Sequence, residues 1–152
     1  MDKKYEITKN FIIVYGTKLY QIKAIRTFGC IKKDDLGGFI EKENNLSHFN
    51  DAWVSGDAQV LGDARVSGDA RVYGTARVSG NAKVSGNAWV SGDARVYGTA
   101  RVSGDAWVYG DAHVYDNALV YGDAKVYGTA HVYGTAHVYG TARVSCNAHW
   151  VS

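Results

Sequence analysis

Three evenly spaced histidines are the residues of this sequence best placed to do chemistry together. His113, His131 and His149 lie eighteen residues apart. If the fold repeated every eighteen residues, neighbouring imidazoles would lie about 4.8 Å apart, the spacing of adjacent β-strands. Two imidazoles at that distance could share a Zn²⁺ or Ni²⁺ ion. The same position of the repeat also holds Arg, Lys, Trp, Gln and Leu, which indicates a variable surface site, and we predict no metal site.

A second set of regularly spaced side chains could form a binding surface. These aromatic residues share the eighteen-residue period: Trp53, Trp89, Trp107, Tyr73, Tyr109 and Tyr127. An exposed stripe of aromatic rings is typical of a protein interface. The alternative is that the rings stack on one another and stabilise the strands without any partner. The sequence leaves both interpretations open.

Both sets are positioned by a six-residue repeat that runs without an insertion from Asp51 to Ser152. The first units read Asp-Ala-Trp-Val-Ser-Gly and Asp-Ala-Gln-Val-Leu-Gly, and there are 17 units. The second residue is always Ala, and the fourth is Val except in the last unit, where it is Trp150. This alternation predicts a four-residue strand with one buried face. Gly followed by Asp, Asn or Thr predicts a two-residue corner.

Strands this short cannot bury their apolar side alone, so the units must stack. Three units per turn give an eighteen-residue coil with three flat faces, and 17 units make nearly six coils. Ala and Val fill the interior, which leaves no room for an internal ligand. We therefore predict an all-β fold in which residues 51–152 form a single-stranded parallel β-helix.

This pattern resembles the hexapeptide-repeat family, whose aliphatic and small residues recur in register as Val54, Ala58, Val60 and Ala64 do here. The resemblance covers about two thirds of the chain and implies a left-handed coil. It also implies two functional classes, because the family contains trimeric acyltransferases as well as structural proteins. Its enzymes place a catalytic His near a corner or an extended loop, and the repeats here contain no such loop.

Residues 1–50 lack the strict repeat and predict an N-terminal β cap, which would cover the strand edges of the first coil. Residues 11–15 and 19–28 are rich in β-branched and aromatic residues, and we expect a hairpin turn at Gly16-Thr17 between them.

A degenerate first coil is expected between this hairpin and the repeats. Ile40 and Leu46 are six residues apart, like two inward positions, whereas Leu46 and Val54 are eight apart, which predicts a two-residue bulge near residues 48–50. The Gly-Gly-Phe-Ile-Glu stretch that ends at Glu41 resembles the N-terminal part of uncharacterised hexapeptide proteins of bacteria and prophages. That resemblance implies a bacterial source, with a phage-encoded origin as one alternative.

Charge and hydropathy argue against nucleic acid and membranes as partners. The net charge is +2, from 17 Lys plus Arg against 15 Asp plus Glu. The repeats themselves contain 8 basic residues and 9 Asp, so they present no net basic surface. No apolar run approaches the length of a membrane helix or a signal peptide. We therefore expect a cytoplasmic protein.

The sequence thus favours a non-enzymatic structural or binding protein that acts through its outer faces and through self-association. Its partner would be another protein or further copies of itself, and no catalytic residue or cofactor is predicted. Trp150 and Val151 are expected to form a self-association surface, because the chain stops directly on the last rung. The alternative is a trimeric enzyme resembling hexapeptide acyltransferases.

Overall fold

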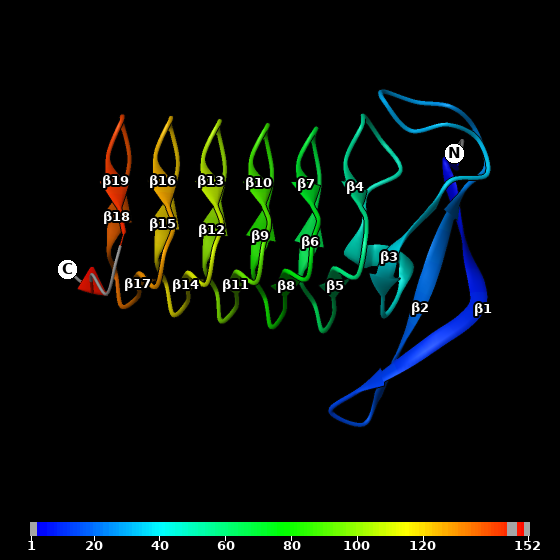
Figure 1. The fold of residues 1–152 in the computed structure, drawn as a ribbon, viewed down its shortest axis with the longest axis horizontal. Coiled ribbons are helices and arrows are strands. Elements are labelled where there is room, and N and C mark those ends of the chain that lie inside the picture. Colours follow the sequence, from blue (N-terminus) through cyan, green and yellow to red (C-terminus); the bar gives the residue numbers. More distant parts are fainter. Residues whose placement is uncertain (1–2, 146–148, 151–152) are drawn as a thin grey trace.

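The computed structural model describes residues 3–145 and 149–150, and for the last two it describes the backbone only. The chain forms a β-solenoid of about six turns, with a β-hairpin at its N-terminal end (Figure 1). This all-β architecture confirms the predicted fold class. The described residues contain no helix long and apolar enough to cross a membrane.

Short strands stack into three parallel sheets. They are called here the tryptophan sheet, the histidine sheet and the serine sheet, the last after Ser67, Ser85 and Ser103, which follow its first three strands. The tryptophan sheet comprises β4 (Trp53–Val54), β7 (Arg71–Val72), β10 (Trp89–Val90), β13 (Trp107–Val108), β16 (Lys125–Val126) and β19 (Arg143–Val144). The serine sheet comprises β6 (Arg65–Val66), β9 (Lys83–Val84), β12 (Arg101–Val102), β15 (Leu119–Val120) and β18 (His137–Val138). The histidine sheet contains β5 (Gln59–Val60), β8 (Arg77–Val78), β11 (Arg95–Val96), β14 (His113–Val114), β17 (His131–Val132) and β20 (His149–Trp150).

Three longer strands of the cap extend the histidine sheet beyond β5. They are β1 (Tyr5–Val14), β2 (Thr17–Ala24) and β3 (Leu36–Ile40). Strand β3 joins the two parts because it pairs antiparallel with β2 and parallel with β5. The cap also contains one 3₁₀ turn, η1 (Glu43–Asn45). Cap and coils share one hydrophobic core, to which Tyr5, Ile22 and Phe28 contribute beside the Ala and Val rows.

Each rung has a strand of two residues, shorter than the four expected. The reason is the hydrogen bond of the Ala N–H, which closes a β-turn at the corner, as in Ala58 N–H to Ser55 O at 3.2 Å. The inward Val residues between positions 54 and 132, Val96 among them, are 0–1% exposed. The apolar rows therefore fill the solenoid as predicted.

The glycine corners are needed for two separate reasons. Gly86 has a φ of +64°, which disfavours residues with a Cβ. A Cβ at this position would also lie 2.9 Å from the backbone N of Gly104 in the next coil. Asp116 takes the same left-handed conformation, with a φ of 58°, in the one corner of the described repeats that lacks Gly.

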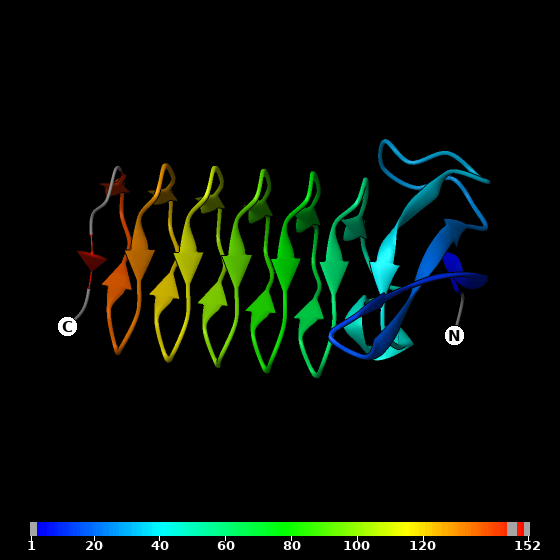
Figure 2. The ribbon, with the colours of Figure 1, turned by 60° about the horizontal axis from the view of Figure 1, so that its bottom comes forward.

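The hairpin turn lies one residue earlier than predicted. Val14 pairs with Thr17, so Tyr15 and Gly16 form the two-residue turn instead of Gly16 and Thr17. Both turn residues have positive φ, 49° and 79°, as a tight hairpin with right-handed strand twist requires. Figure 2 shows the hairpin running alongside the first coils, and the Arg77 guanidinium donates to the Tyr15 hydroxyl at 3.1 Å.

The degenerate first coil and its bulge are confirmed. Ile40 pairs with Val60 and Leu46 with Val66, an offset of twenty residues where regular coils have eighteen. Two extra residues therefore lie between Leu46 and the first repeat. Asn50, with a φ of 58°, takes the corner position that Gly holds in the following coils.

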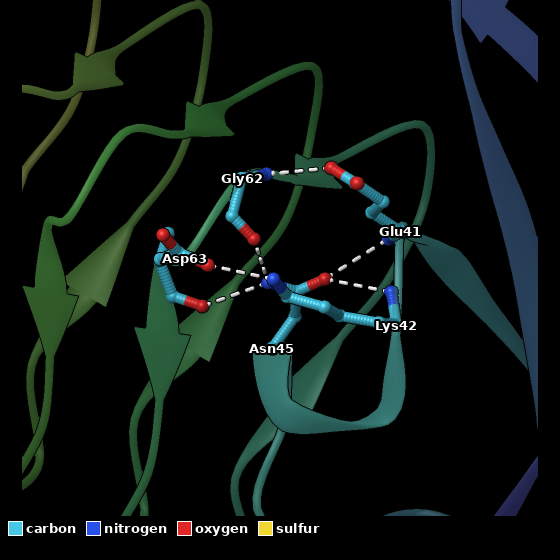
Figure 3. A network of polar contacts seen from close by, with 6 residues as sticks. Glu41, Lys42, Asn45, Gly62 and Asp63 are labelled. Atoms are coloured by element: carbon cyan, nitrogen blue, oxygen red, sulfur yellow. Dashed lines mark hydrogen bonds and ion pairs between the residues drawn. The ribbon is translucent and has the colours of Figure 1, made fainter.

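A polar network ties this coil to the first repeats (Figure 3). The Asn45 side-chain amide donates to the carbonyls of Gly62 at 3.1 Å and Ala64 at 2.8 Å. Its oxygen accepts the backbone N–H groups of Lys42 at 2.8 Å and Glu41 at 3.0 Å. One buried side chain thus does the hydrogen bonding that a regular preceding rung would do.

Candidate functional site

The x position of every rung, between Ala and Val, faces outward, so the strand register fixes which side chains are neighbours on the surface. In the tryptophan sheet, Trp53 pairs with Arg71, Arg71 with Trp89, and Trp89 with Trp107. The row continues to Lys125 and Arg143. The predicted alignment of the three tryptophans on one face is therefore present.

Trp89 and Trp107 form the centre of this surface. Their rings stack in parallel, with centroids 5.1 Å apart and planes within 2° of each other. On the next coil, the Lys125 ammonium lies 4.6 Å from the Trp107 ring centroid. Trp107 is thus held between an aromatic ring and a cation and is still 38% exposed. A rigid apolar surface results.

The adjacent outward row begins at Ser55 and continues through Tyr73, Ser91, Tyr109 and Tyr127 to Ser145. Tyr109 and Tyr127 stack with centroids 5.1 Å apart. Tyr73 meets Trp89 edge to face at 6.0 Å, and Tyr109 meets Trp107 in the same way at 6.4 Å. Ser91 interrupts the row, because its small side chain leaves the space between Tyr73 and Tyr109 open.

Two adjoining hollows lie on this face, and Ser91 lines one of them. One, of about 230 Å³, is lined by Tyr73, Trp89, Ser91, Trp107 and Tyr109. The other, of about 250 Å³, shares Tyr73 and Trp89 with the first and includes Arg71 and Trp53. Together they form an aromatic groove along the tryptophan sheet. Stacking within the ladder and an open apolar surface therefore coexist on this face.

Trp53 departs from the expected exposed stripe. It is in register with the other tryptophans but only 3% exposed, because rings of the cap cover it. Phe28 and Tyr5 meet it edge to face at 5.3 and 6.3 Å. Trp53 therefore serves mainly to anchor the cap and contributes to one end of the groove.

The histidines also stack, as their spacing predicted. His113 and His131 have ring centroids 4.9 Å apart, and Tyr97 packs edge to face against His113. Burial lowers the pKa of His113, and the neighbouring His131 acts in the same direction. The His149 backbone is in register with His131, but its side chain lies outside the described residues. Within the described part of the chain, no three His, Cys, Asp or Glu side chains are grouped so that they could hold a metal ion.

Comparison with known families gives a match to part of the repeat region. The model of the YdcK beta solenoid repeat matches residues 64–75, 76–92, 94–110, 100–116 and 112–128. These repeats are similar to the YdcK beta solenoid repeat. The match agrees with the observed β-solenoid, and the YdcK-like segments include most of the aromatic groove, from Tyr73 to Tyr109. A comparison with curated proteins found no match.

The predicted self-association residues, Trp150 and Val151, come after the last segment that matches the YdcK repeat, which ends at residue 128. Strand β20 pairs with β17, and the backbone of Trp150 is in register with that of Val132. The Trp150 side chain and the whole of Val151 lie outside the described residues. The self-association surface therefore stays a prediction.

Sequence reasoning missed a cavity at the junction of the cap and the coils. It has a volume of about 630 Å³ and lies between η1 and the serine sheet. His48, from the two-residue bulge, and Arg65 and Lys83, from the first coils, contribute to its lining. The irregular spacing between Leu46 and Val54 was the one signal for it, because a bulge is where a regular surface is interrupted.

Proposed function

We propose that the protein is a non-enzymatic, rigid binding module whose aromatic groove receives a segment of a partner protein. The partner segment would carry apolar side chains next to carboxylates. The observation that carries this proposal is the break at Ser91, which leaves a hollow between Tyr73 and Tyr109 with the stacked Trp89 and Trp107 in its lining.

The size of the hollows supports protein side chains as their occupants. At about 230 and 250 Å³, each is smaller than the roughly 300 Å³ at the lower end of small-molecule sites. Aromatic residues and Arg are the residue types that dominate binding energy at protein interfaces. The groove contains both, with Arg71 beside Trp89.

The charge of the row supports acidic residues in the partner. The outward strand positions of the tryptophan sheet hold Arg71, Lys125 and Arg143 and no carboxylate. A partner segment with carboxylates on either side of its apolar anchors would therefore meet complementary charge. The groove is built on stacked rungs instead of long loops, so little conformational entropy is lost when it binds.

Selection of phage-displayed random peptides on the full chain tests this proposal. The enriched peptides are then measured on two variants, each with one added tyrosine. Ser91→Tyr fills the hollow with the residue that its row already holds at three positions. Ser103→Tyr is the matched control, because it extends the Tyr121–Tyr139 stack of the serine sheet in the same way.

Peptides that combine apolar and acidic residues should be enriched. Their affinity should fall by about tenfold or more on Ser91→Tyr, since a filled hollow cannot accept an anchor side chain. It should be unchanged on Ser103→Tyr. Peptides that bind the parent and Ser91→Tyr equally well, or a selection that enriches no such peptides, would refute the proposal.

The hexapeptide resemblance supports three finer proposals, namely a left-handed coil, a bacterial or phage-encoded source and association with further copies of the chain. The handedness rests on that resemblance alone, because the repeat spacing and the inward Ala and Val rows are compatible with a coil of either hand. Vibrational or electronic optical activity of the solenoid would distinguish the two hands. Light scattering would give the oligomeric state.

A further inference from the structure

The cavity beside η1 contains a buried donor that has no acceptor. The His48 side chain is 8% exposed and stacks on Tyr5 with centroids 4.1 Å apart. Its Nδ1 accepts the backbone N–H of Lys4 at 3.3 Å, so in the neutral ring Nε2 carries the proton. Nε2 is buried and makes no hydrogen bond in the described chain. Such a group costs free energy unless something accepts its proton.

The ring of His48 is held in place by its surroundings. Tyr5, which stacks on it, is fixed by hydrogen bonds from its hydroxyl to the carbonyls of Leu46 at 2.7 Å and Glu43 at 3.0 Å. Burial lowers the pKa of His48, so the ring is neutral at neutral pH. The result is a preorganised Nε2–H donor beside the cavity.

The same cavity is lined by more cations than carboxylates. Lys3, Arg65 and Lys83 line it, against the single carboxylate of Glu43. Glu43 is already paired, because its Oε1 lies 3.1 Å from Lys3 Nζ. The same oxygen is 3.9 Å from His48 Nε2, which is too far for a hydrogen bond. Among the described residues, Arg65 and Lys83 form no ion pair. Arg65 and Lys83 are therefore available to bind an anion.

We propose that this cavity binds a small organic oxyanion, a phosphate monoester or a carboxylate, that pairs with Arg65 and Lys83 and, as the cavity wall adjusts to it, accepts the buried Nε2–H of His48. Its volume of about 630 Å³ lies within the range of small-molecule sites. Phe49, which also lines it and is 65% exposed, supplies an apolar surface for the body of the ligand. This inference does not rest on the proposed function, because the cavity and the aromatic groove lie on different sheets.

Calorimetric titration of the full chain with phenyl phosphate, benzoate and inorganic phosphate tests the site. Benzyl alcohol serves as the neutral control. A preference for phenyl phosphate identifies a phosphate ester as the ligand class, and a preference for benzoate identifies a carboxylate. Saturable binding of at least one aromatic anion is expected, with affinity that falls as salt is added.

Substitutions of Arg65 and Lys83, which are both exposed, should leave the fold intact and show whether the ligand binds at this cavity. Arg65→Gln and Lys83→Gln should each weaken binding several-fold, and the double variant about tenfold or more. Arg101→Gln is the matched control, because Arg101 follows Lys83 in the same row but does not line the cavity. The ¹⁵N resonance of His48 Nε2 should shift on binding.

Three results would overturn the proposal. The first is the absence of saturable binding of any aromatic anion at low salt. The second is binding that Arg101→Gln weakens as much as Lys83→Gln does, since that would indicate a general response to surface charge. The third is binding that leaves the His48 resonance unmoved.

Discussion

The ammonium nitrogen of Lys4 lies 2.6 Å from the carbonyl oxygen of Ala52, at the buried junction of cap and coil. In regular coils an Ala carbonyl accepts the N–H of a residue in the preceding coil, as Ala70 O accepts Trp53 N–H. The Lys4 side chain takes that role at the end of the solenoid. It also donates to Asn50 O at 3.1 Å and lies over the Phe28 ring. The cap thus ends the ladder with a buried cation.

Lys4 should make stability depend on pH in the alkaline range. Burial lowers its pKa from 10.5 to about 8, so the unfolded chain binds this proton more tightly than the folded chain. The cost of the buried ammonium is therefore fully present below pH 8, and stability rises as pH increases from about 8 to 10.5. Relative to Lys4→Met, the parent should gain on the order of 1 kcal/mol between about pH 7 and 9.5. Urea unfolding at both pH values measures this, and a pH-independent difference would contradict it.

Asn45 should be the most sensitive polar residue of the cap. Asn45→Ala removes two donors to the carbonyls of Gly62 and Ala64 and the acceptor for two backbone N–H groups. We expect a loss of about 2–4 kcal/mol in the free energy of unfolding, because buried polar groups lose their partners. The exposed neighbour Asn44 is the matched control, and Asn44→Ala should cost well under about 1 kcal/mol. Equal losses would show that the network in Figure 3 does not stabilise the cap.

Three glycine corners allow two costs of adding a Cβ to be measured separately, namely the strained left-handed backbone and the close contact with the next coil. Their φ values are nearly equal, so only the contact differs among them. A Cβ at Gly140 meets no atom of the described residues within 4 Å, one at Gly56 lies 3.2 Å from Gly74 O, and one at Gly86 lies 2.9 Å from Gly104 N. Substitution by Ala should cost about 1–2 kcal/mol at Gly140 for the left-handed conformation alone. The cost should increase at Gly56 and be largest at Gly86. Equal melting temperatures for the three variants would show that coil spacing does not limit the corner residue.

An inward charge should destabilise the middle of the solenoid. Val96 is 0% exposed, so Val96→Asp places a carboxyl group in the Ala and Val core and should cost several kcal/mol. Arg101→Asp, at an exposed outward position, is the control, and we expect it to cost about 1 kcal/mol or less. A Val96→Asp variant that melts within a few degrees of the parent would be incompatible with the observed register.

The repeat made most of the fold predictable. The inward rows of Ala and Val, the three faces and the neighbours of Trp89 and His113 all follow from a period of six, since stacked rungs must stay in register. The bulge after Leu46 followed from the same spacing. The strand length did not, because the competing turn hydrogen bond of Ala58 and its equivalents leaves no mark on the pattern.

The cap was predictable only in outline. Phe28 covers Trp53 and Lys4 reaches Ala52, and both contacts join residues more than twenty positions apart. The cavity lined by His48 also lies between distant parts of the sequence. No periodicity links such residues, so their positions follow from tertiary packing alone. Periodicity does link Trp89 with Trp107, so their alignment could be predicted from the sequence. The hollow at Ser91 could not, because it depends on the positions of the surrounding side chains.

The most direct test of the binding surface is an NMR titration of the full chain with a selected peptide, followed through the indole N–H signals of its 4 tryptophans. The signals of Trp89 and Trp107 should shift together on binding, while the signal of Trp53, buried under Phe28 and Tyr5, should stay in place. Ser91→Tyr should abolish both shifts. Binding of the peptide with the Trp89 and Trp107 signals unmoved would contradict the assignment of the aromatic groove as the binding surface.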